Sequence, residues 1–111
     1  MKTHEVDGVS IIVLKGRIVF GEESNALRAE VKSLIADGKR KIVLNMKEIE
    51  YIDSAGLGML VAAHLSARNH AASLRLCDLG SKFQEVLRIT KLETVFLVCS
   101  TEATAVASFS R

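Results

Sequence analysis

The residues best suited to chemistry stand together where a predicted strand gives way to a predicted helix. In the segment IEYIDSAGLGMLV, residues 49–61, an Asp53-Ser54 pair precedes two glycines. The start of a helix presents N–H groups without intrahelical acceptors and a partial positive charge, so it stabilises phosphate. Ser54 therefore has the chemistry of a switch residue, because its phosphorylation would place a charge of about −1.5 to −2 at an exposed helix end.

The same residues also have a purely structural interpretation. Asp and Ser are both common N-caps, so Asp53 or Ser54 can simply cap the helix, and this role is compatible with phosphorylation. Gly56 and Gly58 each disfavour a helix by up to about 1 kcal/mol relative to alanine. Their lack of a Cβ would let another chain or the sheet approach the backbone closely.

Three enzyme motifs are incomplete in this segment. A nucleophile elbow needs Gly-x-Ser-x-Gly, but Ile52 stands at the first glycine position. A dinucleotide loop needs a third glycine where Val61 stands, and the P-loop sequence Gly-Lys-Ser/Thr is absent. A small hydrolase that uses Ser54, with His64 or His70 as its base, stays as a minor alternative. We expect no enzyme, no catalytic residue and no cofactor.

No metal site is expected, because the cysteines and histidines are scattered. Cys77 and Cys99 lack partners at metal-ligand spacing, and His4, His64 and His70 form no cluster. The two cysteines are interpreted as a pair of buried thiols in a reducing compartment, with a disulfide as the alternative.

Composition and charge limit the class of protein. The chain has 111 residues, of which 49% are hydrophobic and 25% charged, and its net charge is +2. This predicts one globular domain over residues 1–111 and no nucleic-acid partner. No apolar stretch approaches the roughly 20 residues of a membrane span. The first residues lack an apolar signal core, so a cytoplasmic location is expected.

Strands and helices are predicted to alternate along the chain. Asp7-Gly8 is a strong hairpin signal, Gly16 is expected to break the second strand, and Ile18-Val19-Phe20 to resume it. The predicted strands are 2–6, 9–14, 42–44, 74–77 and 95–98; the predicted helices are 22–36, 54–69, 82–89 (with Ser81 as N-cap) and 102–109. This order indicates an α/β sandwich: a short mixed, mostly parallel sheet of four to five strands, opened by an antiparallel hairpin and packed by about four helices.

Three basic residues, Lys39-Arg40-Lys41, separate the first helix from the next strand. They are interpreted as a solvated turn that favours the negative end of the helix, with a phosphate-binding patch as the alternative.

The Asp53-Ser54-Ala55-Gly56-Leu57-Gly58 run, with Tyr51-Ile52 before it and an apolar helix after it, resembles the signature of the STAS domain of bacterial anti-sigma factor antagonists. The resemblance extends over essentially the whole chain and includes Gly16-Arg17-Ile18 and the strand at 42–45. It implies partner switching. The unphosphorylated antagonist binds an anti-sigma factor that is also an ATP-dependent serine kinase, and so frees a sigma factor; phosphorylation ends the binding and a serine phosphatase restores it.

Carried over by motif position, the resemblance makes Ser54 the phosphoacceptor. Asp53 would orient its hydroxyl or contact the partner, and Gly56 and Gly58 would allow close docking. The implied partner-binding residues are Asp53, Ser54, Ala55, Gly56, Leu57, Gly58 and Met59, of which Leu57 and Met59 are expected to be exposed.

This chain departs from the family pattern at three positions. Ala55 stands where antagonists often have Ser or Thr, Val19 where an acid is common, and Lys91 where a glycine is common. The alternative within the family is a non-switching scaffold or adaptor subunit, in a stress-signalling or lipid-transport complex, in which Ser54 only caps its helix. Self-association is compatible with either reading.

Overall fold

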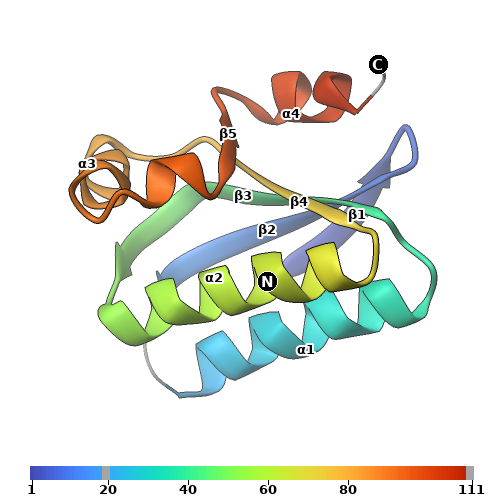
Figure 1. The fold of residues 1–111 in the computed structure, drawn as a ribbon, viewed down its shortest axis with the longest axis horizontal. Helices are drawn as coiled ribbons and strands as arrows, with labels where there is room; N and C mark the ends of the chain where they lie inside the picture. Colours follow the sequence, from blue (N-terminus) through green and yellow to red (C-terminus); the bar gives the residue numbers. More distant parts are fainter. Residues whose placement is uncertain (19–20, 110–111) are drawn as a thin grey trace.

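The computed structural model describes residues 1–18 and 21–109, which form a mixed β-sheet with helices on both faces (Figure 1). The strands are β1 (Lys2–Val6), β2 (Val9–Ile18), β3 (Lys41–Ile52), β4 (Ser73–Cys77) and β5 (Leu97–Cys99). The helices are α1 (Glu22–Ala36), α2 (Ser54–Asn69), α3 (Ser81–Ile89) and α4 (Glu102–Ser108), with a 3₁₀ turn η1 (Leu92–Thr94). The strands lie in the order β1-β2-β3-β4-β5, antiparallel for β1 and β2 and parallel for the rest. The predicted fold class is confirmed.

The opening hairpin forms where the sequence predicts it. Asp7 has a φ of 51° and Gly8 a φ of 79°, so both turn residues lie in the left-handed region that a type I′ turn requires. Val6 and Val9 pair directly across the turn.

The second strand does not break at Gly16, contrary to the prediction. Gly16 has a φ of 82° and lies where the register with β3 shifts, so the strand bulges and continues to Ile18. Ile18 is thereby brought opposite Ile52, the last residue of β3. The predicted continuation through Val19 and Phe20, and with it the departure at Val19, falls outside the described residues.

The central strand β3 is much longer than the predicted 42–44. Ile42, Val43 and Leu44 have no exposed surface, so the strand is buried on both faces here. The strand then continues to Ile52, although β4 pairs with only its first part, 41–45. The second part of β3 pairs with β2 alone and leads directly to α2.

The C-terminal third differs in detail from the predictions. The predicted strand at 95–98 begins two residues later than expected: β5 covers Leu97–Cys99, and η1 precedes it at Leu92–Thr94. Ser81 is the first residue of α3, not its cap, because Gly80 takes the cap position and no side chain bonds there. The predicted last helix is confirmed as α4, which begins with a capping box between Thr101 and Thr104.

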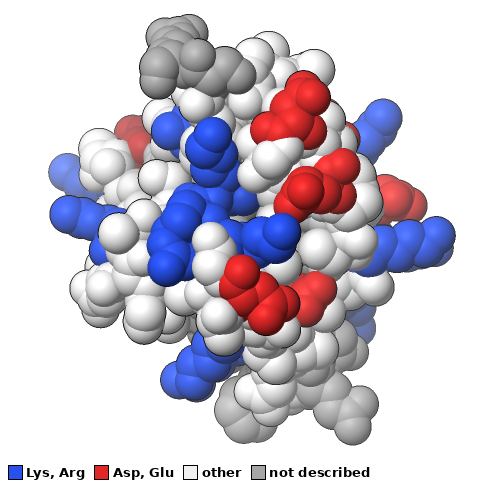
Figure 2. Space-filling view, turned by 90° about the vertical axis from the view of Figure 1, so that its right-hand side faces the viewer, with Lys and Arg blue, Asp and Glu red and all other residues white. Residues whose placement is uncertain are grey.

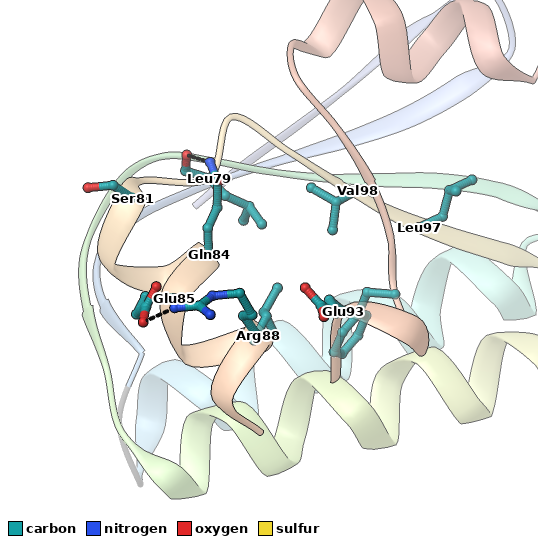
Figure 3. A pocket seen from close by; sticks show the side chains of 10 residues that line it. Leu79, Ser81, Gln84, Glu85, Arg88, Glu93, Leu97 and Val98 are labelled. Carbon is teal, nitrogen blue, oxygen red and sulfur yellow. Dashed lines mark hydrogen bonds and ion pairs between the residues drawn. The ribbon is translucent and has the colours of Figure 1, made fainter. Parts of the chain in front are cut away.

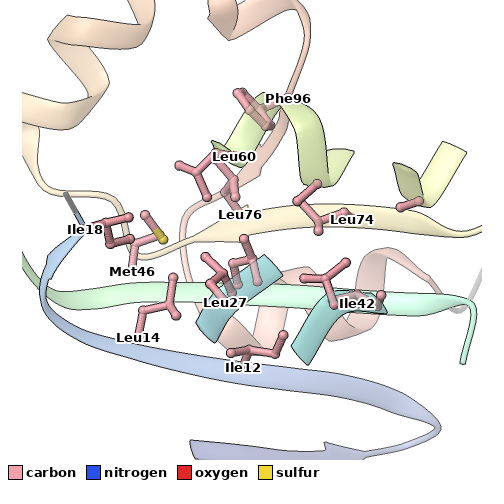
Figure 4. Close-up of a cluster of buried hydrophobic side chains, with 14 of the residues drawn as sticks. Ile12, Leu14, Ile18, Leu27, Ile42, Met46, Leu60, Leu74, Leu76 and Phe96 are labelled. Atoms are coloured by element: carbon pink, nitrogen blue, oxygen red, sulfur yellow. The ribbon is translucent and has the colours of Figure 1, made fainter. Parts of the chain in front are cut away.

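Two apolar clusters hold the layers together. The larger lies between the sheet and the helices α1 and α2 (Figure 4). Leu27, Val31 and Ile35 of α1 recur at helical spacing and are buried in it, and Leu34 packs against it partly buried. The smaller cluster lies between the other face of the sheet and α4 and comprises Val9, Ile11, Val43, Cys77, Ala105 and Val106.

The basic turn behaves as predicted for a helix end. The Arg40 guanidinium donates hydrogen bonds to the carbonyl oxygens of Ile35 (3.2 Å), in the last turn of α1, and Lys39 (3.1 Å). Lys39 Nζ forms an ion pair with Glu5 at 3.0 Å. Figure 2 shows a face of the molecule on which Lys and Arg side chains gather beside Asp and Glu, so the charges on that face are mixed.

The side chain of His64 on α2 is half-buried and packs against Phe96. The ring meets Phe96 edge-on, with centroids 5.4 Å apart, and Nδ1 is buried with no hydrogen-bond partner among the residues that the structure describes. Burial lowers the pKa of His64 below its ordinary value of 6.5, and the charge of Arg68 lowers it further. The Arg75 guanidinium is directed away from His64, to the Ser108 hydroxyl and the Phe109 ring at α4.

We expect the free energy of unfolding to fall as the pH drops below about 6.5, because the unfolded chain then takes up a proton that folded His64 resists. His64→Gln should flatten this dependence. His70→Gln, at the exposed C-cap position of α2, should retain it. Urea unfolding of the three proteins at about pH 7.5 and about pH 5.5 measures the difference. If the free energy of unfolding changed equally with pH in both variants, the pH dependence could not be assigned to His64.

Candidate functional site

The end of β2 fixes the start of α2. The backbone N–H of Asp53 donates to the carbonyl oxygen of Ile18 at 3.2 Å, which extends the pairing of Ile18 with Ile52 by one residue. The chain then turns from extended to helical geometry at Asp53, whose φ is −98° and ψ −179°. The first turn of α2 therefore begins at the carboxyl end of a strand.

Asp53 is the N-cap of α2. Its Oδ1 accepts a hydrogen bond from the Gly56 N–H at 2.7 Å, and its carbonyl oxygen accepts from the Leu57 N–H at 2.9 Å. Of the two predicted capping residues, the structure selects Asp53. The reading in which Ser54 only caps the helix is thus contradicted.

Ser54 is the first helical residue and is exposed. No side-chain hydrogen bond to its hydroxyl occurs within the described residues. The backbone N–H groups of Ser54 and Ala55, in the first turn, have no acceptor within the helix. The Ser54 hydroxyl is therefore accessible to a modifying enzyme, next to backbone donors and the positive end of the helix.

The two glycines of the segment have different environments. A Cβ on Gly56 would lie 2.3 Å from the carbonyl oxygen of Ile18, so this buried glycine is required by the protein's own packing. A Cβ on Gly58 would meet no atom of the described residues within 4 Å, and Gly58 is exposed. Close approach by the sheet is the reason for Gly56, and only Gly58 leaves space for another chain.

The predicted apolar contacts are less exposed than expected. Leu57 and Met59 are half-buried and pack against the larger cluster, while Ala55 is exposed. The accessible part of the predicted partner-binding set is therefore Ser54, Ala55 and Gly58, with the outer edges of Leu57 and Met59.

A groove beside this segment was not found from the sequence. It has a volume of about 450 Å³, lies between the end of β3 and the start of α3, and is largely apolar. Its apolar walls come from Met46, Ile49, Tyr51, Ile52, Phe83 and Val86. Tyr51 is half exposed, and Arg17 of β2 lies over its ring at 5.3 Å. An exposed aromatic residue two positions before Asp53 was the available signal, but only the fold places α3 beside it.

Neither predicted histidine base can reach Ser54. Ser54 and His64 both lie on α2, and ten residues of helix separate them by about 15 Å. His70 is farther along and its Nδ1 lies 2.7 Å from the carbonyl oxygen of Ser66. The two groups nominated for a hydrolase are not brought together.

The cysteines and potential metal ligands can be placed as well. Both cysteines are free thiols, with Cys77 buried and Cys99 only half-buried. Among residues 1–18 and 21–109, no three His, Cys, Asp or Glu side chains are placed to share a metal ion. In the same part of the chain, no helix is both long and apolar enough to cross a bilayer.

A family model for the STAS domain matches residues 1–105. The chain belongs to the STAS-domain family. It is 30% identical over 105 residues to BtrV of Bordetella bronchiseptica, a candidate anti-sigma factor antagonist, with 95% of this chain and 90% of BtrV covered.

Two solved structures share the fold. A crystal structure of a candidate anti-sigma factor antagonist from Thermotoga maritima superposes with a TM-score of 0.90 at 24% identity, covering 99% of this chain and 94% of that one. The phosphorylated form of the Bacillus cell fate determinant SpoIIAA gives a TM-score of 0.75 at 19% identity, with 97% of each chain covered.

We expect opposite stability effects from the same substitution at the two glycines of this STAS domain. Gly56→Ala should destabilise it by about 1–3 kcal/mol, because the new methyl group meets a backbone carbonyl that cannot move aside. Gly58→Ala should stabilise it by up to about 1 kcal/mol through helix propensity. Urea unfolding of both variants measures the effects, and a shift of the same sign in both would refute the packing argument.

A second pair of variants separates the cap from the proposed acceptor. Asp53→Ala should lower the free energy of unfolding by about 0.5–2 kcal/mol through loss of the N-cap. Ser54→Ala should change it by less than about 0.5 kcal/mol, because no capping bond is lost. Thermal or urea unfolding distinguishes the two variants. A larger loss of stability in Ser54→Ala than in Asp53→Ala would show that Ser54, not Asp53, caps the helix.

Proposed function

We propose that this STAS protein is an anti-sigma factor antagonist that acts by partner switching. The unphosphorylated form binds an anti-sigma factor that is also a serine kinase, and so frees a sigma factor. Phosphorylation at Ser54 ends the binding, and a serine phosphatase restores it. The protein acts as a binding module in the cytoplasm, over residues 1–111, and the kinase supplies the ATP site.

The proposal rests on the different roles of two neighbouring residues, Asp53 and Ser54. Asp53 caps α2, which leaves the exposed Ser54 hydroxyl without a role in the helix start. A serine in this position can gain or lose a phosphate without loss of the cap. A phosphorylated form of a protein with the same fold, SpoIIAA, supports the proposal.

The surface around Ser54 suits a partner that is sensitive to charge. Half-buried Leu57 and Met59, exposed Tyr51 and the adjoining apolar groove offer area that a partner can cover. A phosphate at Ser54 would stand at the margin of this area. Desolvating its charge against an apolar partner surface is costly, so binding weakens while the fold is retained.

The position of the phosphate also favours the folded protein. It would lie beside the first amides of α2, at the positive end of the helix, where negative charge is stabilised. The carboxylate of Asp53 is adjacent and repels it, but this carboxylate is engaged with the Gly56 N–H. We therefore expect phosphorylation to act on the interface and not on folding.

The proposal is tested by introducing a negative charge at either of two exposed helical serines. Wild type, Ser54→Glu and Ser33→Glu serve as baits in native lysate of the source organism, and bound proteins are identified by mass spectrometry. Ser33 is exposed on α1, so Ser33→Glu is the matched control. A protein with a kinase domain should bind wild type and Ser33→Glu, and bind Ser54→Glu at least about tenfold more weakly.

The recovered kinase then tests the acceptor. With ATP it should phosphorylate wild type and Ser33→Ala but not Ser54→Ala, and Ser54→Ala should still bind it. Equal recovery of the same proteins on all baits, or equal labelling of Ser54→Ala, would reject partner switching at Ser54.

A further inference from the structure

The two cysteines of the chain, far apart in sequence, are direct neighbours in the sheet. Cys77 ends β4 and Cys99 ends β5, and the two are register partners in the parallel pair. Residues opposite one another on adjacent parallel strands point to the same face. Both cysteines accordingly pack in the smaller apolar cluster under α4, Cys77 as a buried member and Cys99 at its margin.

The spacing of the strands suits a covalent bond between these residues. Adjacent strands lie about 4.8 Å apart, and disulfides join residues whose Cα atoms are about 4.4–6.8 Å apart. Both side chains are free thiols in this structure. The chain therefore holds a reduced pair in a geometry that needs little movement to be oxidised.

The two thiols differ in access and in reactivity. Burial, together with a hydrogen bond to Asp78 and nearby negative charge, raises the pKa of the Cys77 thiol to about 12. Cys77 also has no exposed surface, so it is shielded from an oxidant in solution. Cys99 is half-buried at the edge of the sheet and is the thiol that an oxidant meets first.

We propose that Cys77 and Cys99 form a site of reversible oxidation, at which a hydroperoxide converts the two thiols to an intramolecular disulfide. The Cys99 sulfur attacks the peroxide oxygen; the O–O bond breaks, Cys99 becomes a sulfenic acid and water or an alcohol leaves. The Cys77 sulfur then attacks the Cys99 sulfur, and the displaced hydroxide leaves as water with the Cys77 proton. Two thiols are oxidised by two electrons and one hydroperoxide is reduced.

The bond would restrain β5, a short strand at the edge of the sheet. β5 has three residues and pairs on one side only, with β4. Leu97 and Val98 of β5 border a hollow of about 530 Å³ shared with α3 and η1, so little packs against that side of the strand (Figure 3). A Cys77–Cys99 bond would close the segment that carries α3 and η1 into a loop. The inference does not depend on the role of Ser54.

The test uses the folded protein and hydrogen peroxide. After exposure and removal of the peroxide, intact wild-type protein should lose the mass of two hydrogen atoms and give a monomeric Cys77–Cys99 cross-linked peptide. Dithiothreitol should reverse both changes. Cys99→Ser should show no mass loss. In Cys77→Ala, a sulfenic acid should instead be trapped at Cys99 by dimedone.

Thermal unfolding supplies an independent readout. Closing a loop of about twenty residues restricts the unfolded chain, so the oxidised wild type should unfold at a temperature several degrees higher than the reduced form. Cys99→Ser should show no such shift. The proposal is overturned if the native protein yields only disulfide-linked dimers, or sulfinic acid at Cys99 with Cys77 still free. Cys99 is half-buried, so Cys99→Ser should still fold. This variant therefore tests the proposal even if Cys77→Ala does not fold.

Discussion

The carbonyl oxygen of Ile18 is the point on which the arrangement of the site depends. It accepts the hydrogen bond of the Asp53 N–H, and it occupies the space that a side chain at position 56 would need. The last residue of β2 thus sets both where β3 ends and how closely α2 crosses it. With the backbone fixed on both sides, Asp53 can only turn into the helix, and Ser54 emerges on the surface.

This constraint separates two kinds of residue within a single turn of helix. Asp53 and Gly56 serve the fold: one caps α2 and the other admits the Ile18 carbonyl. Ser54, Ala55 and Gly58 are exposed. This division suits the proposed switch, because a phosphate on Ser54 would leave the capping hydrogen bond of Asp53 in place. Ala55 is compatible with this arrangement, since no hydroxyl at that position is needed for the cap.

The sequence was sufficient for the elements that follow from local chemistry. Asp7-Gly8 predicted the hairpin, whose turn residues have the positive φ values that a type I′ turn requires, and the apolar spacing in 22–36 predicted a helix that buries Leu27, Val31 and Ile35. It could not decide between Asp53 and Ser54 as the cap, because both residue types cap helices and the choice depends on where β3 stops. It also missed the bulge at Gly16, the full length of β3 and the groove beside Tyr51. Each of these arises from pairing between segments distant in sequence, which no local pattern encodes.

The two faces of the sheet are held by different means. On the face covered by α1 and α2, a continuous apolar cluster fixes the helices. On the other face α4 contributes only Ala105 and Val106 as buried side chains, so polar contacts matter more. Glu102, in its first turn, accepts a hydrogen bond from buried Asn45 of β3 at 2.8 Å and lies 3.7 Å from His4 of β1. A helix held by a small cluster and a few polar contacts opens more readily than one held by a large cluster. The α4 face is therefore the side on which Cys99 can be reached without disturbing the α2 face that carries Ser54.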